Sequence, residues 1–165
     1  MSLRARARAC RYGVCVVIRA LVDTLLARRQ RRTRAAGGLR VEYAPRRDGR
    51  PDPGEIVWTW VPYEDDPAQG KDRPVLIIGR DGADRLYGLQ LTSKDHDRDA
   101  AQEARAGRLW VDIGAGDWDR ERRPSEVRIN RLLEIDPRSV RREGAVLDRA
   151  RFDTVIAAAR PYLRT

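Results

Sequence analysis

The sequence has few of the side chains that bind metal ions or form disulfides. It contains two cysteines, Cys10 and Cys15, and a single histidine, His96. Both cysteines lie near the start of the chain, so we expect no disulfide framework in the main domain, and this usage suits a reducing cytoplasm. The cysteine spacing matches no zinc-binding pattern. We therefore expect no metal site built by the protein and no cofactor.

Long uninterrupted apolar runs are also missing. The most apolar part of residues 1–50 runs from Tyr12 to Arg29, with aliphatic side chains at helical spacing. Arg19 interrupts this run, so we expect no membrane span. Asp23 and the arginine-rich stretch that follows argue against a cleaved export signal. We predict a basic N-terminal arm that is helical or disordered, with an interfacial helix and an RNA-binding arm as functional alternatives.

Acidic residues are scarce in the same segment. Residues 1–50 carry 14 Arg against three acidic residues, whereas residues 51–165 carry 20 Lys and Arg against 22 Asp and Glu. The net charge of +9 therefore belongs to the arm. An argument from charge for nucleic-acid binding applies to the arm first. The length allows one domain and an extension, and we place the boundary between residues 50 and 51.

Short strand-like segments dominate the sequence after residue 50. β-branched and aromatic residues are concentrated in residues 56–61, 75–78, 86–91 and 108–113, and residues 126–135 alternate weakly. Asp148 is predicted to cap a final helix. The apolar face of that helix is formed by Phe152, Val155, Ile156, Ala159 and Leu163. We predict a mainly β (α+β) fold, a small closed β-barrel with one C-terminal helix packed on it.

Two of these segments, residues 75–78 and 86–91, are predicted to form a hairpin. Between them, residues 81–84 have the composition of a tight turn, with Gly82 at a position that can adopt a positive φ. If Gly82 and Ala83 are the two central residues, counting back along both strands places Arg73 opposite Thr92. Opposed side chains have Cβ atoms about 5 Å apart. This register therefore predicts a guanidinium beside a hydroxyl at the open end of the hairpin.

The order of these segments resembles the MazF/PemK family of bacterial toxins, the toxin components of type II toxin–antitoxin systems. The resemblance is carried by Pro53 to Trp58, Lys71 to Ile78 and Leu91 to Ser93. Residues 124–127, residues 132–135 and the final amphipathic stretch fit the end of the family pattern. The resemblance covers residues 51–165. It implies an SH3-like barrel that is usually a homodimer.

Arg73 and Thr92 are the candidate catalytic residues. Metal-free RNA cleavage uses the neighbouring 2′-hydroxyl as nucleophile and needs a base, an acid and charge stabilisation on the phosphorane. A single histidine excludes a two-histidine arrangement. The resemblance implies that Arg73 clamps the phosphate and that Thr92 hydrogen-bonds one of its oxygens. The alternative for Arg73 is a surface ion pair with Asp72 or Glu64.

Five further residues are candidates for substrate binding. Gln90 and Ser93 could donate hydrogen bonds to a phosphate or a base, although Ser93 could equally be a turn hydroxyl at a strand end. Tyr63, on the loop before Arg73, is the best candidate for stacking on a base, and Lys71 belongs to the same set. His96 is either a proton donor or an exposed loop histidine. The tryptophans of the strands are expected in the core or at a dimer interface.

Three functions compete at this point. The first, implied by the resemblance, is a cytoplasmic toxin that cuts single-stranded mRNA to a 2′,3′-cyclic phosphate and a 5′-hydroxyl, and so inhibits translation and growth. Its partners would be a cognate antitoxin, a second copy of the chain and operator DNA through the antitoxin complex. The second is a non-catalytic CcdB-like barrel that binds a protein such as gyrase. The third is a DNA- or RNA-binding module that acts through the basic arm. The pair of Arg73 and Thr92 favours the first, because a gyrase binder does not need it.

Overall fold

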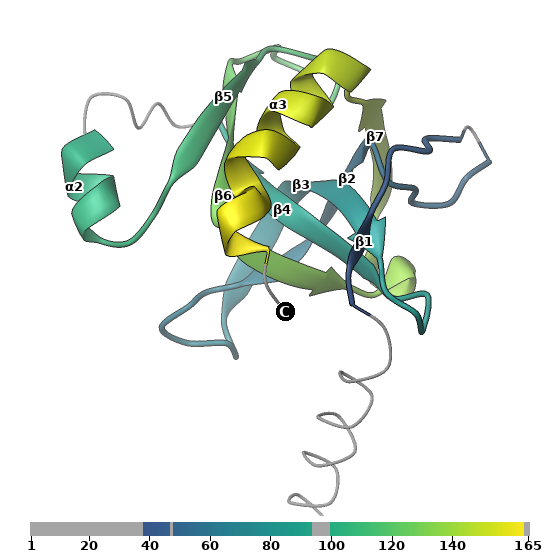
Figure 1. Ribbon diagram of the computed structural model, residues 1–165, viewed down its shortest axis with the longest axis horizontal. Helices are drawn as coiled ribbons and strands as arrows, with labels where there is room; N and C mark the ends of the chain where they lie inside the picture. The colour runs from purple at the N-terminus through teal and green to yellow at the C-terminus, as the bar shows by residue number, and fades with distance from the viewer. Residues whose placement is uncertain (1–37, 47, 94–99, 164–165) are drawn as a thin grey trace, which may run out of the picture. The chain divides into compact units, whose positions relative to one another are not determined.

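The described part of the chain forms one compact unit that begins at Gly38. The computed structural model describes residues 38–46, 48–93 and 100–163 (Figure 1). Of the arm that the sequence predicts, residues 1–37 lie outside the described residues. Residues 38–50, which the sequence analysis assigned to the arm, belong to the same compact unit as the strands.

Strands in the described part of the chain form one antiparallel sheet. They are β1 (Arg40–Val41), β2 (Glu55–Pro62), β3 (Gly70–Arg80), β4 (Leu86–Thr92), β5 (Trp110–Gly114), β6 (Ser125–Ile135) and β7 (Arg142–Val146). Their order across the sheet is β5-β6-β4-β3-β2-β7, and β1 pairs with β3 beyond the end of the β2 pairing. The helical elements are α2 (Ala100–Arg105), α3 (Arg149–Ala159) and two 3₁₀ turns, Pro137–Ser139 and Arg160–Tyr162.

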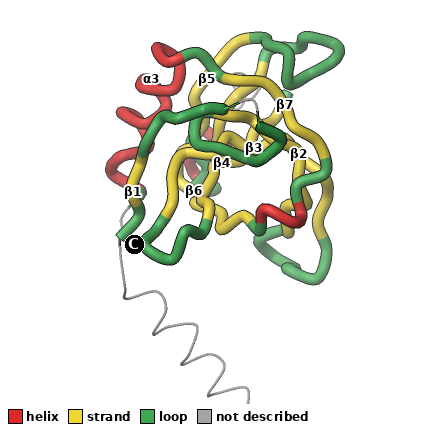
Figure 2. The backbone as a smooth tube through the Cα atoms, turned by 90° about the vertical axis from the view of Figure 1, so that its right-hand side faces the viewer, coloured by secondary structure: helices red, strands yellow, loops and turns green. Residues whose placement is uncertain are grey.

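The predicted fold class, mainly β with a C-terminal helix, is confirmed. The sheet curls into a half-barrel, and α3 lies along its outside (Figure 2). Within the described residues the barrel is not closed through its edges, because β5 and β7 do not pair with each other. The short strands β1 and β7 were not predicted. β1 is only two residues long, and β7 (REGAV) contains two charged residues and a glycine, so neither shows the alternation that marks the other strands.

Two hydrophobic clusters lie on the two faces of this sheet. On β3, Leu76 and Ile78 belong to the larger cluster, which also contains Phe152 of α3. Val75 and Ile77, which alternate with them, belong to the smaller cluster on the opposite face. These side chains are fully buried, and each burial contributes about 1.5–3 kcal/mol. Helix α3 therefore covers the face that carries the larger cluster, and the smaller cluster is buried on the opposite face.

Helix α3 begins and packs as predicted. The Asp148 carboxylate accepts a hydrogen bond from the Arg151 N–H at 3.0 Å and so caps the helix. Phe152, Val155 and Ala159 are buried against the larger cluster. Figure 1 shows the helix lying across the sheet near β5 and β6.

The central hairpin has the predicted register between residues 75–77 and 88–90, where the β3–β4 pairing ends before Arg73 and Thr92, but it has a different turn. The positive φ is at Asp84 (59°) and not at Gly82, and the Asp81 N–H donates to the Arg85 carbonyl at 3.1 Å. The predicted two-residue turn is therefore wrong, because residues 82–84 form a longer loop that shifts the pairing by one. A bulge between Ile77 and Gly79 shifts it back. As a result Val75 pairs with Gln90, the partner that the predicted register assigns to it.

Residues 38–46 and 48–53, here called the strap, are packed against the sheet and α3. Tyr43 donates its hydroxyl to the Leu147 carbonyl at 2.9 Å, and its ring meets the Phe152 ring edge-on. Pairing of β1 with β3 requires Gly79, because a Cβ there would lie 2.2 Å from the Arg40 carbonyl oxygen. The strap is thus part of the folded unit that carries the site.

Candidate active site

A polar groove opens at the end of the hairpin that contains Arg73. Its volume is about 520 Å³, and Tyr63, Lys71, Arg73, Gln90 and Thr92 all contribute to its lining. Five of the seven residues predicted from the sequence are therefore brought together in one place.

The other two predicted residues lie elsewhere. Ser93 lines an adjoining hollow of about 270 Å³, which Lys71, Arg73 and Thr92 also line. His96 lies outside the described residues. Arg73 and Thr92 therefore stand between two hollows, and Ser93 faces only one of them.

Strand alternation explains why these side chains meet. Arg73 has the same parity on β3 as Val75 and Ile77 of the smaller cluster, so it projects from the sheet face opposite α3. On β4, Gln90 and Thr92 have the parity opposite to that of Leu89 and Leu91, which face α3. The groove is therefore the polar continuation of the smaller cluster.

The Arg73 guanidinium is half-buried and has no protein counterion within the described residues. Neither predicted partner pairs with it, because Asp72 binds Arg141 at 3.0 Å and Glu64 binds Arg128 at 2.9 Å. Burial lowers the pKa of Arg73, while the Tyr63 hydroxyl acts in the opposite direction. Arginine remains a cation at neutral pH all the same. A partly desolvated cation without a counterion is suited to binding an anionic ligand.

Two arginines of β6 enter the same groove because of a bulge. Arg128 and Arg131 are three residues apart, so in a regular strand they would project from opposite faces. Leu91 pairs with Val127 while Leu89 pairs with Leu132, which leaves residues 128–131 as an enlarged bulge. Bulges re-aim side chains in this way. Both arginines line the groove as a result.

Glu64 holds these two arginines. Its carboxylate accepts from both terminal nitrogens of Arg128, each at 2.9 Å, in a bidentate fork. The same carboxylate lies 3.6 Å from Arg131 Nε. These contacts, the Arg128 hydrogen bond first among them, hold the pKa of Glu64 below its usual value. Glu64 is therefore ionised at neutral pH.

The groove carries a surplus of positive charge. Five cationic side chains, Lys71, Arg73, Arg108, Arg128 and Arg131, share its lining with the carboxylates of Glu64, Asp65 and Glu103. Glu103 pairs with Arg108 at 3.0 Å. The surplus is local, because residues 51–165 as a whole carry slightly more acidic than basic residues. A groove of this sign favours anionic ligands such as phosphates.

Three groove residues were not predicted from the sequence: Arg108, Arg128 and Arg131. Arg108 precedes β5, and its place in the groove depends on how the chain returns from α2. Arg128 and Arg131 are re-aimed by a bulge that has no clear signal in the sequence. A weak hint was available, because the alternation of residues 126–135 is irregular at this point.

Aromatic side chains near the groove differ in whether they are exposed enough to stack on a base. Tyr63 lines the groove and is 40% exposed, as a base-stacking residue requires. Trp60 is 47% exposed but lines neither hollow, so it is not a core residue of the protomer. Trp58 donates its indole N–H to the Trp118 carbonyl at 3.1 Å, and Trp110 donates to Glu103 at 3.2 Å. These two tryptophans are bonded into the fold.

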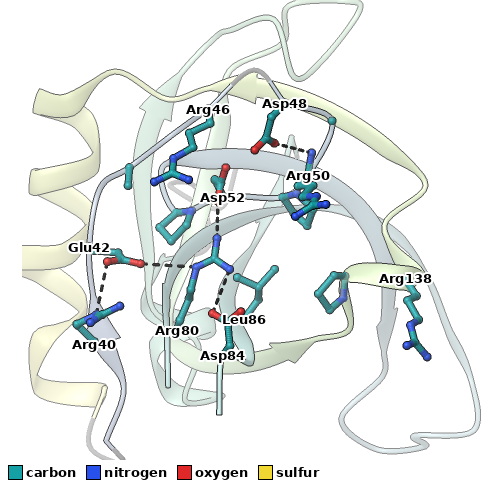
Figure 3. A pocket seen from close by; sticks show the side chains of 15 residues that line it. Arg40, Glu42, Arg46, Asp48, Arg50, Asp52, Arg80, Asp84, Leu86 and Arg138 are labelled. Atoms are coloured by element: carbon teal, nitrogen blue, oxygen red, sulfur yellow. Dashed lines mark hydrogen bonds and ion pairs between the residues drawn. The ribbon is translucent and has the colours of Figure 1, made fainter. Parts of the chain in front are cut away.

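A further polar hollow, of about 660 Å³, lies at the turn end of the β3–β4 hairpin, away from Arg73 (Figure 3). Arg80 lies at its centre and binds Glu42, Asp52 and Asp84, as the dashed lines show. The strap supplies much of its lining. Because its central arginine already has acidic partners, this hollow is a weaker candidate for anion chemistry than the groove at Arg73.

None of the described helices is both long enough and apolar enough to cross a membrane. Within the same residues, no group of three histidine, cysteine or acidic side chains is arranged to hold a metal ion.

The fold is a small β domain, a curled antiparallel sheet with a terminal helix and an arginine-rich groove. Residues 52–163 match a protein family described as the PemK-like, MazF-like toxin of type II toxin-antitoxin system. The match covers more than half of the chain, and the chain belongs to this family. The family resemblance noted from the sequence is thereby confirmed. No curated protein sequence matches the chain.

Proposed function

We propose that this toxin is an endoribonuclease that cuts single-stranded mRNA without a metal ion and so inhibits translation and growth. The observation that carries the proposal is Arg73. It is half-buried, has no counterion within the described residues and lines the same groove as Thr92. This arrangement fits a scissile phosphate, which would pair with the Arg73 guanidinium.

Charge stabilisation is the main contribution of this site to the reaction. Attack of the 2′-hydroxyl on phosphorus produces a phosphorane with extra negative charge on its non-bridging oxygens. Arg73 can donate two parallel N–H groups to these oxygens. Thr92 can donate its hydroxyl to one of them and hold the phosphate in line. The 2′-hydroxyl gives up its proton to water as it attacks, and the departing 5′-oxygen takes up a proton from water, which leaves a 2′,3′-cyclic phosphate on one product and a 5′-hydroxyl on the other.

The flanking residues have roles in holding the RNA chain. Lys71 lines both hollows beside Arg73 and can neutralise a neighbouring phosphate as a point charge. Tyr63 can stack on a base next to the cleaved bond. Ser93 and Gln90 can bind phosphate or base edges on either side. A single strand is the natural substrate, because its bases are free to stack on protein side chains.

The partners follow from the family and from the charge of the groove. A type II toxin is paired with an antitoxin, and an acidic antitoxin segment would complement the cationic surplus of the groove. We further propose that the toxin acts in the cytoplasm as a homodimer, and that operator DNA is reached through the antitoxin complex.

The test is a cleavage assay with the full-length protein. A mixed-sequence RNA is incubated with it in EDTA, and the new ends are mapped. We expect discrete cuts with 5′-hydroxyl and 2′,3′-cyclic phosphate ends. Activity that is lost in EDTA and restored by Mg²⁺ would contradict the metal-independent reaction. Intact RNA under both conditions would contradict the endoribonuclease itself.

A further inference from the structure

The contact between Glu64 and Arg128 resembles the binding of a phosphate. A carboxylate and a phosphate both present two oxygens to the fork of a guanidinium, and arginine binds either of them in a bidentate manner. Glu64 makes both bonds of this kind to Arg128, at 2.9 Å each. Its position is in the same groove as Arg73. Glu64 therefore stands where an anionic group of a bound ligand could stand.

The arginines are fixed more firmly than the carboxylate that they bind. The Arg128 side chain is 7% exposed, whereas that of Glu64 is 45% exposed. Arg131 has other anchors, because it donates to the Gln90 side chain at 3.1 Å and to the Pro62 carbonyl at 2.7 Å. Removal of Glu64 would therefore leave Arg131 in place. Glu64 follows the end of β2, in the connection to β3, and can move without disturbing the sheet.

Arg131 also connects this pair of arginines to Arg73. Burial lowers the pKa of Arg131, Glu64 acts against this, and the positive charges of Arg128 and Arg73 lower it further. The backbones of β3 and β6 are separated only by β4. At about 4.8 Å per strand this places them on the order of 10 Å apart. The groove thus holds two adjacent cationic positions, one at Arg73, which has no counterion among the described residues, and one that binds Glu64.

We propose that Arg128 and Arg131 form a second phosphate subsite, for a phosphate next to the one on Arg73, and that Glu64 occupies this subsite until RNA displaces it. This inference rests on the proposed function, because it assumes that the groove binds RNA. Glu64 is then an internal competitor that lowers the affinity for RNA. While no RNA is bound, it also spares the protein the cost of a buried arginine without a counterion.

The test measures binding separately from cleavage. The probe is a fluorescent single-stranded DNA of mixed sequence, which has no 2′-hydroxyl and cannot be cut by this chemistry. Its Kd is measured for the full-length wild type and for Glu64→Gln over a series of salt concentrations. We expect Glu64→Gln to bind roughly threefold to tenfold more tightly, because the competing carboxylate is gone. The dependence of log Kd on log salt should steepen by about 0.7, the value for one additional phosphate contact on a single strand.

Asp65→Asn is the matched control. Asp65 lines the same groove, but its carboxylate has no hydrogen bond or ion pair within the described residues. The Asp65→Asn substitution removes the same charge without opening the subsite. The salt dependence of its Kd for the probe should therefore equal that of the wild type. Glu64→Asp provides a second variant that keeps the charge but is too short to reach both Arg128 nitrogens. It should bind the probe with an affinity between those of the wild type and Glu64→Gln.

Each outcome separates this inference from the proposed function. If Glu64→Gln and Glu64→Asp bind the probe no more tightly than the wild type, the inference is overturned and Glu64 is a structural brace. Equal tightening by Asp65→Asn would also overturn it, because the effect would then be one of general charge. If the wild type neither binds the probe nor cuts RNA, the proposed function fails first.

Discussion

The rings of Tyr43 and Phe152 meet edge-on, with centroids 5.1 Å apart and planes at 61°. This contact joins the strap to α3 across a long stretch of sequence. The Arg149 guanidinium lies over the Tyr43 ring, 5.3 Å from its centroid. The family match begins at residue 52, so Tyr43 precedes it. A residue that lies before the matched range therefore packs against the hydrophobic core.

Truncation should distinguish the arm from the strap. Removal of residues 1–37 should leave the free energy of unfolding nearly unchanged if the compact unit that begins at Gly38 is self-sufficient. Removal of residues 1–50 should destabilise the protein, because it deletes β1 and Tyr43. Tyr43→Ala alone should cost about 2–4 kcal/mol in urea unfolding. Tyr162→Ala, which changes an exposed tyrosine, is the control. Equal stability of the two truncations would contradict the role of the strap.

Asp81 should stabilise the hairpin turn in a pH-dependent way. Its carboxylate accepts from the Arg85 side chain at 2.7 Å and from the Ala83 N–H at 2.9 Å. Burial acts to raise the pKa of Asp81, but these hydrogen bonds outweigh it and the pKa is lowered. Since the folded-state pKa lies below the unfolded one, the stabilisation is full above the unfolded pKa of about 4 and is lost as the pH falls through the folded-state pKa.

Asp81→Asn should therefore cost about 1–3 kcal/mol near neutral pH, because it disrupts a partly buried set of hydrogen bonds. Chemical unfolding at neutral pH and at about pH 3 checks this, and the difference from wild type should shrink at the lower pH. Asp84→Asn is the control, because that carboxylate is well exposed and asparagine tolerates a positive φ. A difference that grows at low pH would contradict the assignment.

The part of the site that could be predicted from the sequence lies on strands with regular alternation. Arg73, Gln90 and Thr92 could be grouped because alternation along two well-marked strands fixes their faces. Their register survived an error in the turn because the loop ending at Asp84 and the bulge after Ile77 cancel. That cancellation has no signature in the sequence. The predicted and observed registers agree at Val75 and Gln90 only because the bulge reverses the shift made by the longer loop.

The arginines of β6 could not be predicted in the same way. Strand parity places Arg128 and Arg131 on opposite faces, and only the bulge opposite Gln90 brings them together. The strap was hidden for a different reason. The strap is held by a two-residue strand that pairs beside Gly79 and by Tyr43, which packs against Phe152 of α3. These features leave no periodic pattern in the sequence. Irregular backbone and long-range single contacts are features that local sequence patterns do not encode.

Tyr63 should contribute to RNA affinity through its ring. Stacking of one base on an aromatic side chain is worth about 1–3 kcal/mol, so Tyr63→Ala should weaken RNA binding by roughly tenfold. Tyr63→Phe should retain most of the affinity, because it keeps the stacking face. Trp60→Ala is the control, since Trp60 is similarly exposed but lines neither hollow. A larger loss for Trp60→Ala than for Tyr63→Ala would place the base-binding surface elsewhere.

Thr92 should act together with Arg73 on one phosphate. Thr92→Ala removes one neutral hydrogen bond and should slow RNA cleavage less than Arg73→Ala does. The double variant should be no slower than Arg73→Ala alone, because groups that act on the same phosphate are not additive. Single-turnover rates of the three variants check this. Fully additive losses would mean that the two residues act at different steps.

The central claim is tested most directly by the cleavage rate of Arg73→Ala in EDTA, measured under single-turnover conditions with the full-length protein. Arg73 has no counterion within the described residues, so the substitution should leave the thermal unfolding midpoint nearly unchanged. The rate should fall by about 100-fold or more, because the main stabiliser of the phosphorane charge is lost. An Arg73→Ala protein that is folded and cuts RNA at the wild-type rate would contradict the account.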